Sequence, residues 1–175
     1  MNLGATNYLY DILDKILSQI TLKMHAVDWA RSCNLVRDSH YGGTLVFNGP
    51  ACRTLQHNLD KLVGLLIHNG LLGRCKPILD VFEKYKNVVQ SCFGNVLYPR
   101  YANDIREFAG AFFNLINFCE EISTPENQIK VNVIPKIHII FLHIIHFIEQ
   151  QRETHKVEFG LGFYSAQWYE SSKSL

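Results

Sequence analysis

The sequence predicts an all-α protein, and three observations support that prediction. Apolar residues recur at intervals of three and four through several long segments, which is the period of an amphipathic helix. Only one stretch, residues 44–48, resembles a strand, and it is short. The connections are mostly short, and the chain shows neither a linker nor an internal repeat. We therefore expect a single helical bundle of about six to seven helices, forming one domain over residues 1–175.

The first two helices are expected at residues 6–24 and 25–33. Leucine and isoleucine recur at three and four along the first of them. Thr6 or Asn7 is its expected N-cap, because both residue types accept hydrogen bonds from the free N–H groups of a first helical turn. A polar loop with glycine and proline turn signals follows and ends at Pro50.

Three further helices are expected over residues 50–69, 77–92 and 100–121. Each carries a stripe of aliphatic and aromatic side chains at helical spacing. Pro50 suits the first turn of the first helix, where a missing N–H costs nothing. Gly94 suits the position after the second helix, where a left-handed residue often ends the turn.

The helix expected at residues 135–153 contains the most apolar run of the chain. Its apolar side chains occur all round the axis, which is typical of the central helix of a bundle. The run is shorter than the roughly 20 residues that cross a membrane, so no membrane association is expected. Three histidines interrupt it: His138, His143 and His146. A last helix is expected to begin at Ser165.

These histidines have two interpretations. His143 and His146 are three residues apart, so one helix face presents both and can supply two ligands of a zinc site. His138 lies about 12 Å along the axis from His146, too far for one ion. The metalloprotease pattern of two histidines four apart around a glutamate is absent. We expect all three to be polar residues of the core, each hydrogen-bonded to a neighbour, with no bound metal.

Composition sets limits on function and location. Seventeen basic and sixteen acidic residues give a net charge of +1, which argues against a dedicated nucleic-acid binder. The amino terminus has no basic segment before an apolar block, so no signal peptide is expected. The five cysteines are scattered without close pairs, which favours free thiols in a reducing compartment. We expect an intracellular protein, cytoplasmic or nuclear.

Motifs of known chemistry are missing from the sequence. Neither a phosphate-binding loop nor a nucleophile elbow is present. The paired carboxylates lie at polar positions of expected helices and are interpreted as solvated surface. The sequence therefore predicts no cofactor and no catalytic residue.

Four stretches of the chain share an order and spacing with known sequences. They read "YGGTLVFNGPACRTLQHNLDKL", "CFGNVLYPRYANDIREF", "PKIHIIFLHIIHFI" and "GLGFYSAQWYESS" and span about residues 40–172. In this order they resemble a poorly characterised family of proteins encoded by transposon-like mobile elements of invertebrate genomes. The resemblance implies the helical C-terminal half of a transposase-like protein.

The last of these stretches departs from the family. Its usual form is Ser-Glu-Gln, two variable positions, Glu-Ser, one variable position and His. Here Ala166 replaces the first acid and Lys173 the histidine, whereas Glu170 is kept. Two-metal transposase chemistry needs several converging carboxylates. We expect this chain to lack the amino-terminal part that supplies the others, so an active nuclease is not expected.

The resemblance implies a domesticated domain that has lost catalysis and persists as a binding module. We therefore predict a non-enzymatic interaction module that acts through protein–protein contact or self-association. The candidate contact residues are Phe163, Tyr164, Trp168, Tyr169 and Glu170.

Two alternatives stay open. The first is a nucleic-acid-binding remnant, which would use a set of cationic residues around the polar loop. That set is Arg31, Arg37, His40, Arg53 and Lys61. The second is a metal-dependent enzyme, which would use the three histidines and one acid. That set is His138, His143, His146 and Glu170.

Overall fold

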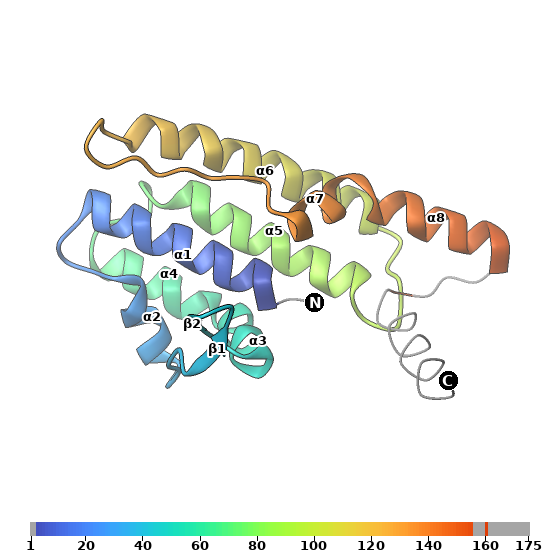
Figure 1. Ribbon diagram of the computed structural model, residues 1–175, viewed down its shortest axis with the longest axis horizontal. Helices are drawn as coiled ribbons and strands as arrows, with labels where there is room; N and C mark the ends of the chain where they lie inside the picture. The colour runs from blue at the N-terminus through green and yellow to red at the C-terminus, as the bar shows by residue number, and fades with distance from the viewer. Residues whose placement is uncertain (1–2, 156–159, 161–175) are drawn as a thin grey trace. The chain divides into compact units, whose positions relative to one another are not determined.

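The computed structural model describes residues 3–155 and Gly160 of the chain (Figure 1). Its helices are α1 (Leu3–Ile20), α2 (Ala26–Ser32), α3 (Gly49–His57), α4 (Leu59–His68), α5 (Lys76–Cys92), α6 (Tyr101–Ile122), α7 (Pro135–Leu142) and α8 (Ile144–His155). Its strands are β1 (Ser39–Tyr41) and β2 (Thr44–Val46). Apart from this hairpin, every regular element of the described residues is a helix, so the all-α prediction is confirmed.

The chain forms two compact units. The first comprises Met1–Phe82 with Phe113–Asn132, and the second comprises Glu83–Phe112 with Val133–Leu175. The two boundaries fall inside α5 and α6, so each of these helices contributes residues to both units. That the whole chain folds as one domain stays a prediction.

Within the first unit, an aromatic cluster joins four segments around Trp29 of α2. The Trp29 ring stacks at 6.3 Å on Tyr10 of α1 and meets Phe82 of α5 edge-on at 5.3 Å. Phe47, which follows β2, meets Tyr10 edge-on at 4.8 Å. All four side chains are buried. Such offset and edge-on pairs add about 0.5–1.5 kcal/mol each to the burial itself. The cluster fixes how α1, α2 and the hairpin meet.

The segment predicted as one helix from residue 50 to residue 69 is two helices, α3 and α4. They separate at Asn58, whose φ of −118° and ψ of 35° leave the helical region. Its side chain donates a hydrogen bond of 2.7 Å to the Thr54 carbonyl, and its own carbonyl accepts one of 3.0 Å from the Trp29 indole. Asparagine competes with the helical main chain in this way. The buried tryptophan uses the carbonyl that the break exposes.

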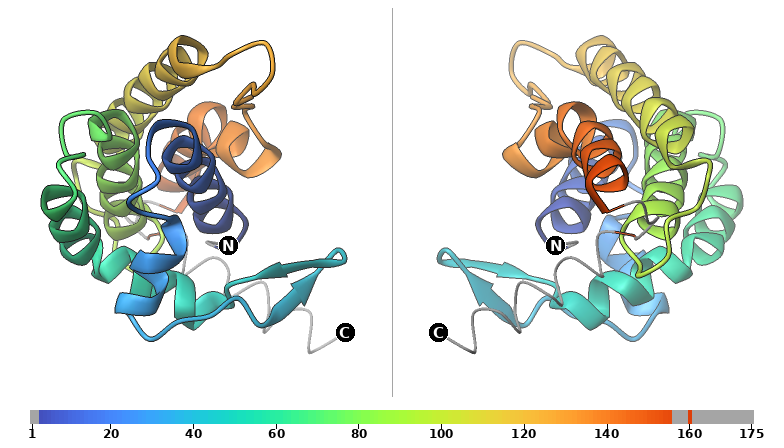
Figure 2. Two further views of the ribbon diagram at one scale, coloured as in Figure 1. Left: turned by 90° about the vertical axis from the view of Figure 1, so that its left-hand side faces the viewer. Right: turned by 90° about the vertical axis from the view of Figure 1, so that its right-hand side faces the viewer.

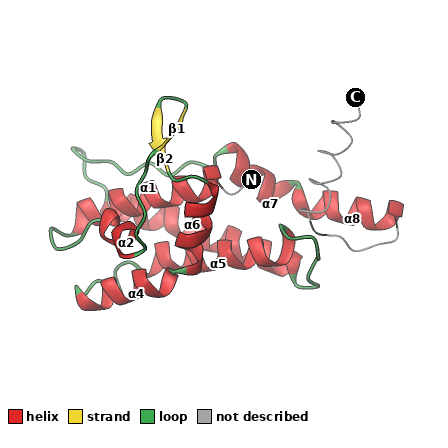
Figure 3. Cartoon of the chain, turned by 90° about the horizontal axis from the view of Figure 1, so that it is seen from below, coloured by secondary structure: helices red, strands yellow, loops and turns green. Residues whose placement is uncertain are grey.

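A hairpin occupies part of the predicted polar loop. β1 and β2 pair antiparallel, with His40 opposite Leu45. Gly42 and Gly43 form the turn with φ of 58° and 81°, as the favoured two-residue hairpin turn requires. The hairpin stands out from the helices of its own unit (Figures 2 and 3). Only its second strand overlaps the strand-like stretch of the sequence.

Within the second unit, α7 packs on α6 through phenylalanines. The Phe141 ring lies 5.4 Å from Phe108 and 5.6 Å from Phe112, both at steep angles. Phe108 also lies 5.5 Å from Tyr85 of α5. These rings form the aromatic part of the core of this unit.

The helix predicted at residues 135–153 is divided into α7 and α8 at His143. The main-chain hydrogen bonds from His143 to Ile139 and from Phe147 to His143 continue through the break, so the pair is a bent helix. Its fully covered isoleucines lie on one face and are Ile137, Ile140, Ile144 and Ile148. Ile139 and Leu142 are 49% and 63% exposed. The structure thus differs from the expected central helix, because neighbouring elements cover only one face.

None of the helices in the described ranges is long and apolar enough to cross a membrane.

Candidate functional site

A groove lies between the last turns of α6 and the segment that follows it, all within the first unit. Its volume is about 520 Å³. The lining combines apolar side chains with two opposite charges and several neutral polar groups. It consists of Ile116, Glu120, Ser123, Thr124, Pro125, Gln128, Ile129, Lys130, Val131 and Asn132.

Ser123 organises the turn at the start of this segment. Its hydroxyl donates to the Cys119 carbonyl at 2.6 Å and accepts from the Ile129 N–H at 2.9 Å. Thr124 and Asn127 close a smaller loop with reciprocal main-chain hydrogen bonds of 3.1 Å. Ile129 is buried beneath it. Serine and threonine favour such local bonds, which explains why the helix ends here.

Helix α1 holds the same segment from the other side. The Tyr8 hydroxyl donates to the Asn132 carbonyl and accepts from the Asn132 N–H, both at 2.8 Å. The Gln19 amide donates to the Ile122 carbonyl at 2.9 Å and accepts from the Asn127 side chain. Residues 122–132 are therefore fixed at both ends and the middle, so the groove wall is preformed.

The centre of the wall offers main-chain groups to a ligand. Within the described ranges, neither the N–H nor the C=O of Lys130 or Val131 is hydrogen-bonded. Glu120 and Lys130 add one charge of each sign to the lining, and both are exposed. A surface with free peptide groups and sparse charge suits another peptide chain better than a reacting small molecule.

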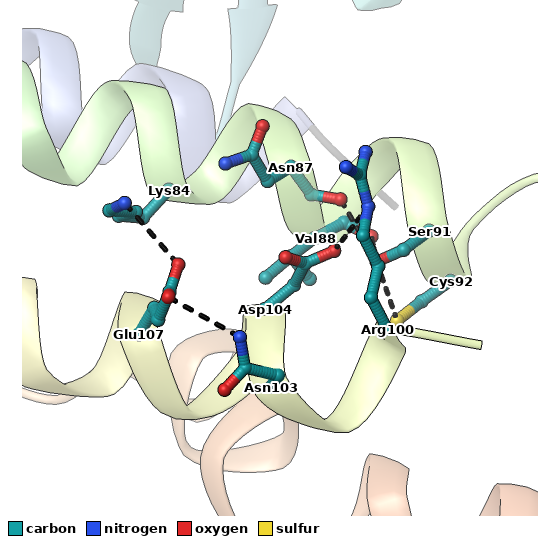
Figure 4. Close-up of polar contacts among 9 residues, drawn as sticks. All are labelled: Lys84, Asn87, Val88, Ser91, Cys92, Arg100, Asn103, Asp104 and Glu107. Atoms are coloured by element: carbon teal, nitrogen blue, oxygen red, sulfur yellow. Dashed lines mark hydrogen bonds and ion pairs between the residues drawn. The ribbon is translucent and has the colours of Figure 1, made fainter. Parts of the chain in front are cut away.

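A second polar cluster joins α5 and α6 within the second unit (Figure 4). Lys84 and Glu107 pair at 3.3 Å, and the Asn103 amide donates to Glu107 at 3.3 Å. Asp104 is buried, with its Oδ2 atom 3.3 Å from the Arg100 Nε. Of these contacts, the Lys84–Glu107 pair connects the two helices, whereas the other two lie within α6 and the residue that precedes it.

Cys92 lies beside this cluster and is buried. The pKa of its thiol is raised to about 11, because burial and, to a smaller extent, the Asp104 charge raise it more than the hydrogen bond with Ser91 lowers it. The Ser91 hydroxyl donates to the Asn87 carbonyl at 2.9 Å. Burial likewise raises the pKa of Cys75 and of Cys119 to about 11. A protonated, buried thiol is inert, which agrees with cysteines used as small apolar residues.

Of the five cations predicted for nucleic-acid binding, two have structural contacts. The Arg37 guanidinium lies 2.6 Å from the Asp11 carboxylate and 4.2 Å from the centre of the Tyr10 ring. Lys61 donates a hydrogen bond of 3.0 Å to the Ser32 carbonyl.

The other three cations are Arg31, His40 and Arg53, which are exposed on α2, β1 and α3. The structure thus leaves a smaller cationic set than the sequence suggested.

The three histidines of α7 and α8 are exposed, so the prediction of a polar core is wrong for them. No hydrogen bond joins any of them to a neighbour through its ring within the described ranges. The physical reason is the one-sided burial of the helix, which puts Ile137, Ile140 and Ile144 inward and the histidines outward. The described residues contain no group of three or more metal-binding side chains.

The predicted contact residues lie outside the described residues. They are Phe163, Tyr164, Trp168, Tyr169 and Glu170.

The sequence did not predict the groove, because residues 123–132 show neither the helical nor the strand spacing of apolar residues. Ser123 and Thr124 are a local signal for side-chain bonds to the main chain, and they point to a turn but not to a groove. Tyr8 lies far away in the sequence, and only the tertiary structure brings its hydroxyl to Asn132.

Fold and site together define an all-α protein with a preformed polar groove at the end of a long helix. Comparison with known proteins finds no family model, no curated protein and no solved structure that matches the chain.

Proposed function

We propose that the protein is a non-enzymatic interaction module whose groove receives an extended segment of a partner protein. The observation that carries this proposal is the main chain of Lys130 and Val131, which has no partner among the described residues and lies in a wall that other hydrogen bonds hold in place. An extended peptide can satisfy these groups by pairing alongside them, as in strand addition.

The preformed wall favours affinity. Ordering a flexible segment on binding costs roughly 0.5–1.5 kcal/mol for each immobilised side chain. Tyr8, Gln19 and Ser123 already impose this order in the free protein. Glu120 and Lys130 favour a peptide that carries one basic and one acidic side chain.

The proposal also covers the evolutionary origin of the protein and the compartment in which it acts. A domesticated domain of a transposase-like protein, left without catalysis, would act inside the cell by binding a protein. The nucleic-acid alternative has less support, because Arg37 and Lys61 already have intramolecular partners. A metal-dependent enzyme has less support too, because the three histidines are exposed rather than gathered in a pocket.

The test is selection of peptides from a displayed random library on the full chain, followed by anisotropy titrations with the selected peptides. Lys130→Pro removes a main-chain donor of the wall and the positive charge, and Glu120→Gln removes the negative charge. Each is expected to weaken binding about tenfold or more, equivalent to about 1.4 kcal/mol. The matched control for Lys130→Pro is Lys130→Ala, which removes the charge but keeps the main-chain N–H and should therefore weaken binding less. The control for Glu120→Gln is Glu121→Gln, which changes an exposed neighbour outside the groove lining.

Selection of no peptide, or equal binding by Lys130→Pro and Lys130→Ala, would reject main-chain pairing in the groove. Amide chemical shifts of Lys130 and Val131 give an independent readout, because both must move when the peptide pairs with the main chain. Circular dichroism of each variant shows whether its fold is kept.

A further inference from the structure

We propose that His138 and His143 form a two-histidine site for a divalent transition-metal ion, of which zinc is the probe used below. The site goes beyond the proposed function, since it lies on α7 and at the bend before α8 and shares no residue with the groove. It also differs from the pair that the sequence suggested, which was His143 with His146.

The bend brings the two rings together. In a straight helix, residues five apart point about 140° away from each other, so their side chains do not meet. At the bend, His143 has φ −116° and ψ −30°. The ring centres of His138 and His143 lie 5.3 Å apart, with an angle of 56° between the ring planes.

That separation fits two ligands of one ion. A zinc–nitrogen bond is about 2.0–2.1 Å, and tetrahedral coordination by two imidazoles then places their ring centres about 5 Å apart. The observed 5.3 Å is within the range that small side-chain rotations cover.

The exposure of the two rings and the metal preference of imidazole also fit a metal site. Both histidines are exposed, so an ion can reach them. Apart from their contact with each other, the rings have no hydrogen-bond or ion-pair partner in the described ranges, and their nitrogens stay available. Imidazole prefers zinc, copper and nickel over magnesium or calcium. Water or a second copy of the chain would supply the other coordination positions.

The test is a zinc titration of the full chain by calorimetry after chelator treatment. We expect saturable binding that weakens about tenfold or more in His138→Ala and in His143→Ala, as loss of one of two ligands implies. The matched control is His146→Ala, an exposed histidine of the same bent helix outside the pair. His68→Ala in α4 is a second control, since it removes a histidine of another helix.

A second readout uses the wild-type chain alone. Zinc is expected to protect His138 and His143 from diethylpyrocarbonate, and His146 is expected to react at the same rate with and without zinc. Binding that survives both substitutions unchanged, or no binding and no protection at all, would overturn the proposal.

Discussion

At the scale of single residues, Asn7 has an unusually complete set of partners. Its side chain lies buried in α1, donates to the Phe47 carbonyl at 3.0 Å and accepts from the Phe47 N–H at 2.9 Å. One amide thus satisfies both main-chain groups of a residue forty positions later. Asn7 was expected only as a helix cap, and the long-range role follows from the position of Phe47 in the aromatic cluster.

Replacing Asn7 tests how much its side-chain amide contributes to the free energy of unfolding. Asn7→Ala leaves the buried N–H of Phe47 without its partner and leaves the C=O with the weak thiol donor of Cys52, and a lost partner of a buried polar group costs roughly 1–3 kcal/mol. We expect the free energy of unfolding to fall by about 2–4 kcal/mol in urea titrations. Asn114→Ala, at an exposed site of α6, is the control and is expected to change little. Equal stabilities of the two variants would contradict the role.

Buried ionisable groups predict how stability depends on alkaline pH. Burial raises the pKa of Tyr10 to about 12, although the Arg37 charge lowers it in part. The pKa values of Cys75, Cys92 and Cys119 are raised to about 11. Because the folded state holds these protons more tightly than the unfolded state, their contribution is complete below about pH 9 and is lost as pH rises toward 12.

Urea unfolding of wild type between pH 7 and 11.5 is expected to show this fall in stability. Cys119→Ala removes one of the groups, so its stability should decline less steeply between pH 9 and 11. Val88→Ala truncates a buried residue that does not titrate and should keep the slope of wild type. A Cys119→Ala profile that runs parallel to wild type would count against the explanation.

At the scale of elements, breaks in two predicted helices determine which side chains come into contact. Periodicity predicted single helices at residues 50–69 and 135–153, and both are broken. At the first break, the Asn58 side chain donates to the Thr54 carbonyl of the preceding turn, and the Asn58 carbonyl accepts from the distant Trp29 indole. At the second, His143 bends the helix and meets His138. The apolar stripe continues through each break, so the sequence pattern does not reveal it.

Gly160 shows how closely two segments approach within the second unit. Its N–H donates to the Asn95 carbonyl at 3.0 Å, and a methyl group on its Cα would clash with the Gly94 carbonyl oxygen. We expect Gly160→Ala to lower the free energy of unfolding by about 1–3 kcal/mol, because the main chain around Gly94 must move aside. Hydrogen exchange of the amides around residues 94–97 should quicken at the same time.

The control for this substitution is Gly64→Ala in α4. The added methyl group meets open space there, and alanine favours a helix interior by about 0.5–1 kcal/mol over glycine. The two substitutions are therefore expected to have opposite signs. Destabilisation by both to the same extent would disprove the close approach at Gly160.

At the scale of the whole molecule, the chain has two compact units and two helices that contribute to both. Helices α5 and α6 cross the boundaries without interruption, so unfolding of either unit alone would have to break a helix. Single domains of up to about 150 residues usually unfold in one cooperative transition, and this chain of 175 residues is slightly longer. The sequence-based prediction of one domain can be tested on this basis.

We expect a single unfolding transition. Far-UV circular dichroism follows all helices, and fluorescence of a Trp168→Phe variant reports Trp29 in the first unit. The midpoints of the two signals should coincide in urea and on heating. Separate midpoints, or amides of α7 that exchange at lower urea concentration than those of α1, would show that the units unfold independently.

The sequence by itself determined the helical class and the positions of most helices. A helix repeats every 3.6 residues, so a local stripe of apolar residues is enough to predict it. Leu9, Leu13 and Ile16 of α1 are all fully buried, as their spacing predicted.

Only the tertiary structure decided which faces are covered and which distant groups meet. Exposure of His138 and His143 depends on where the neighbouring elements stop, and the groove depends on Tyr8 reaching Asn132 across the chain. Such contacts join residues far apart in sequence, and no short-range pattern of residue types encodes them. The physical reason is that helical periodicity is a local property, whereas burial and pairing are set by long-range packing.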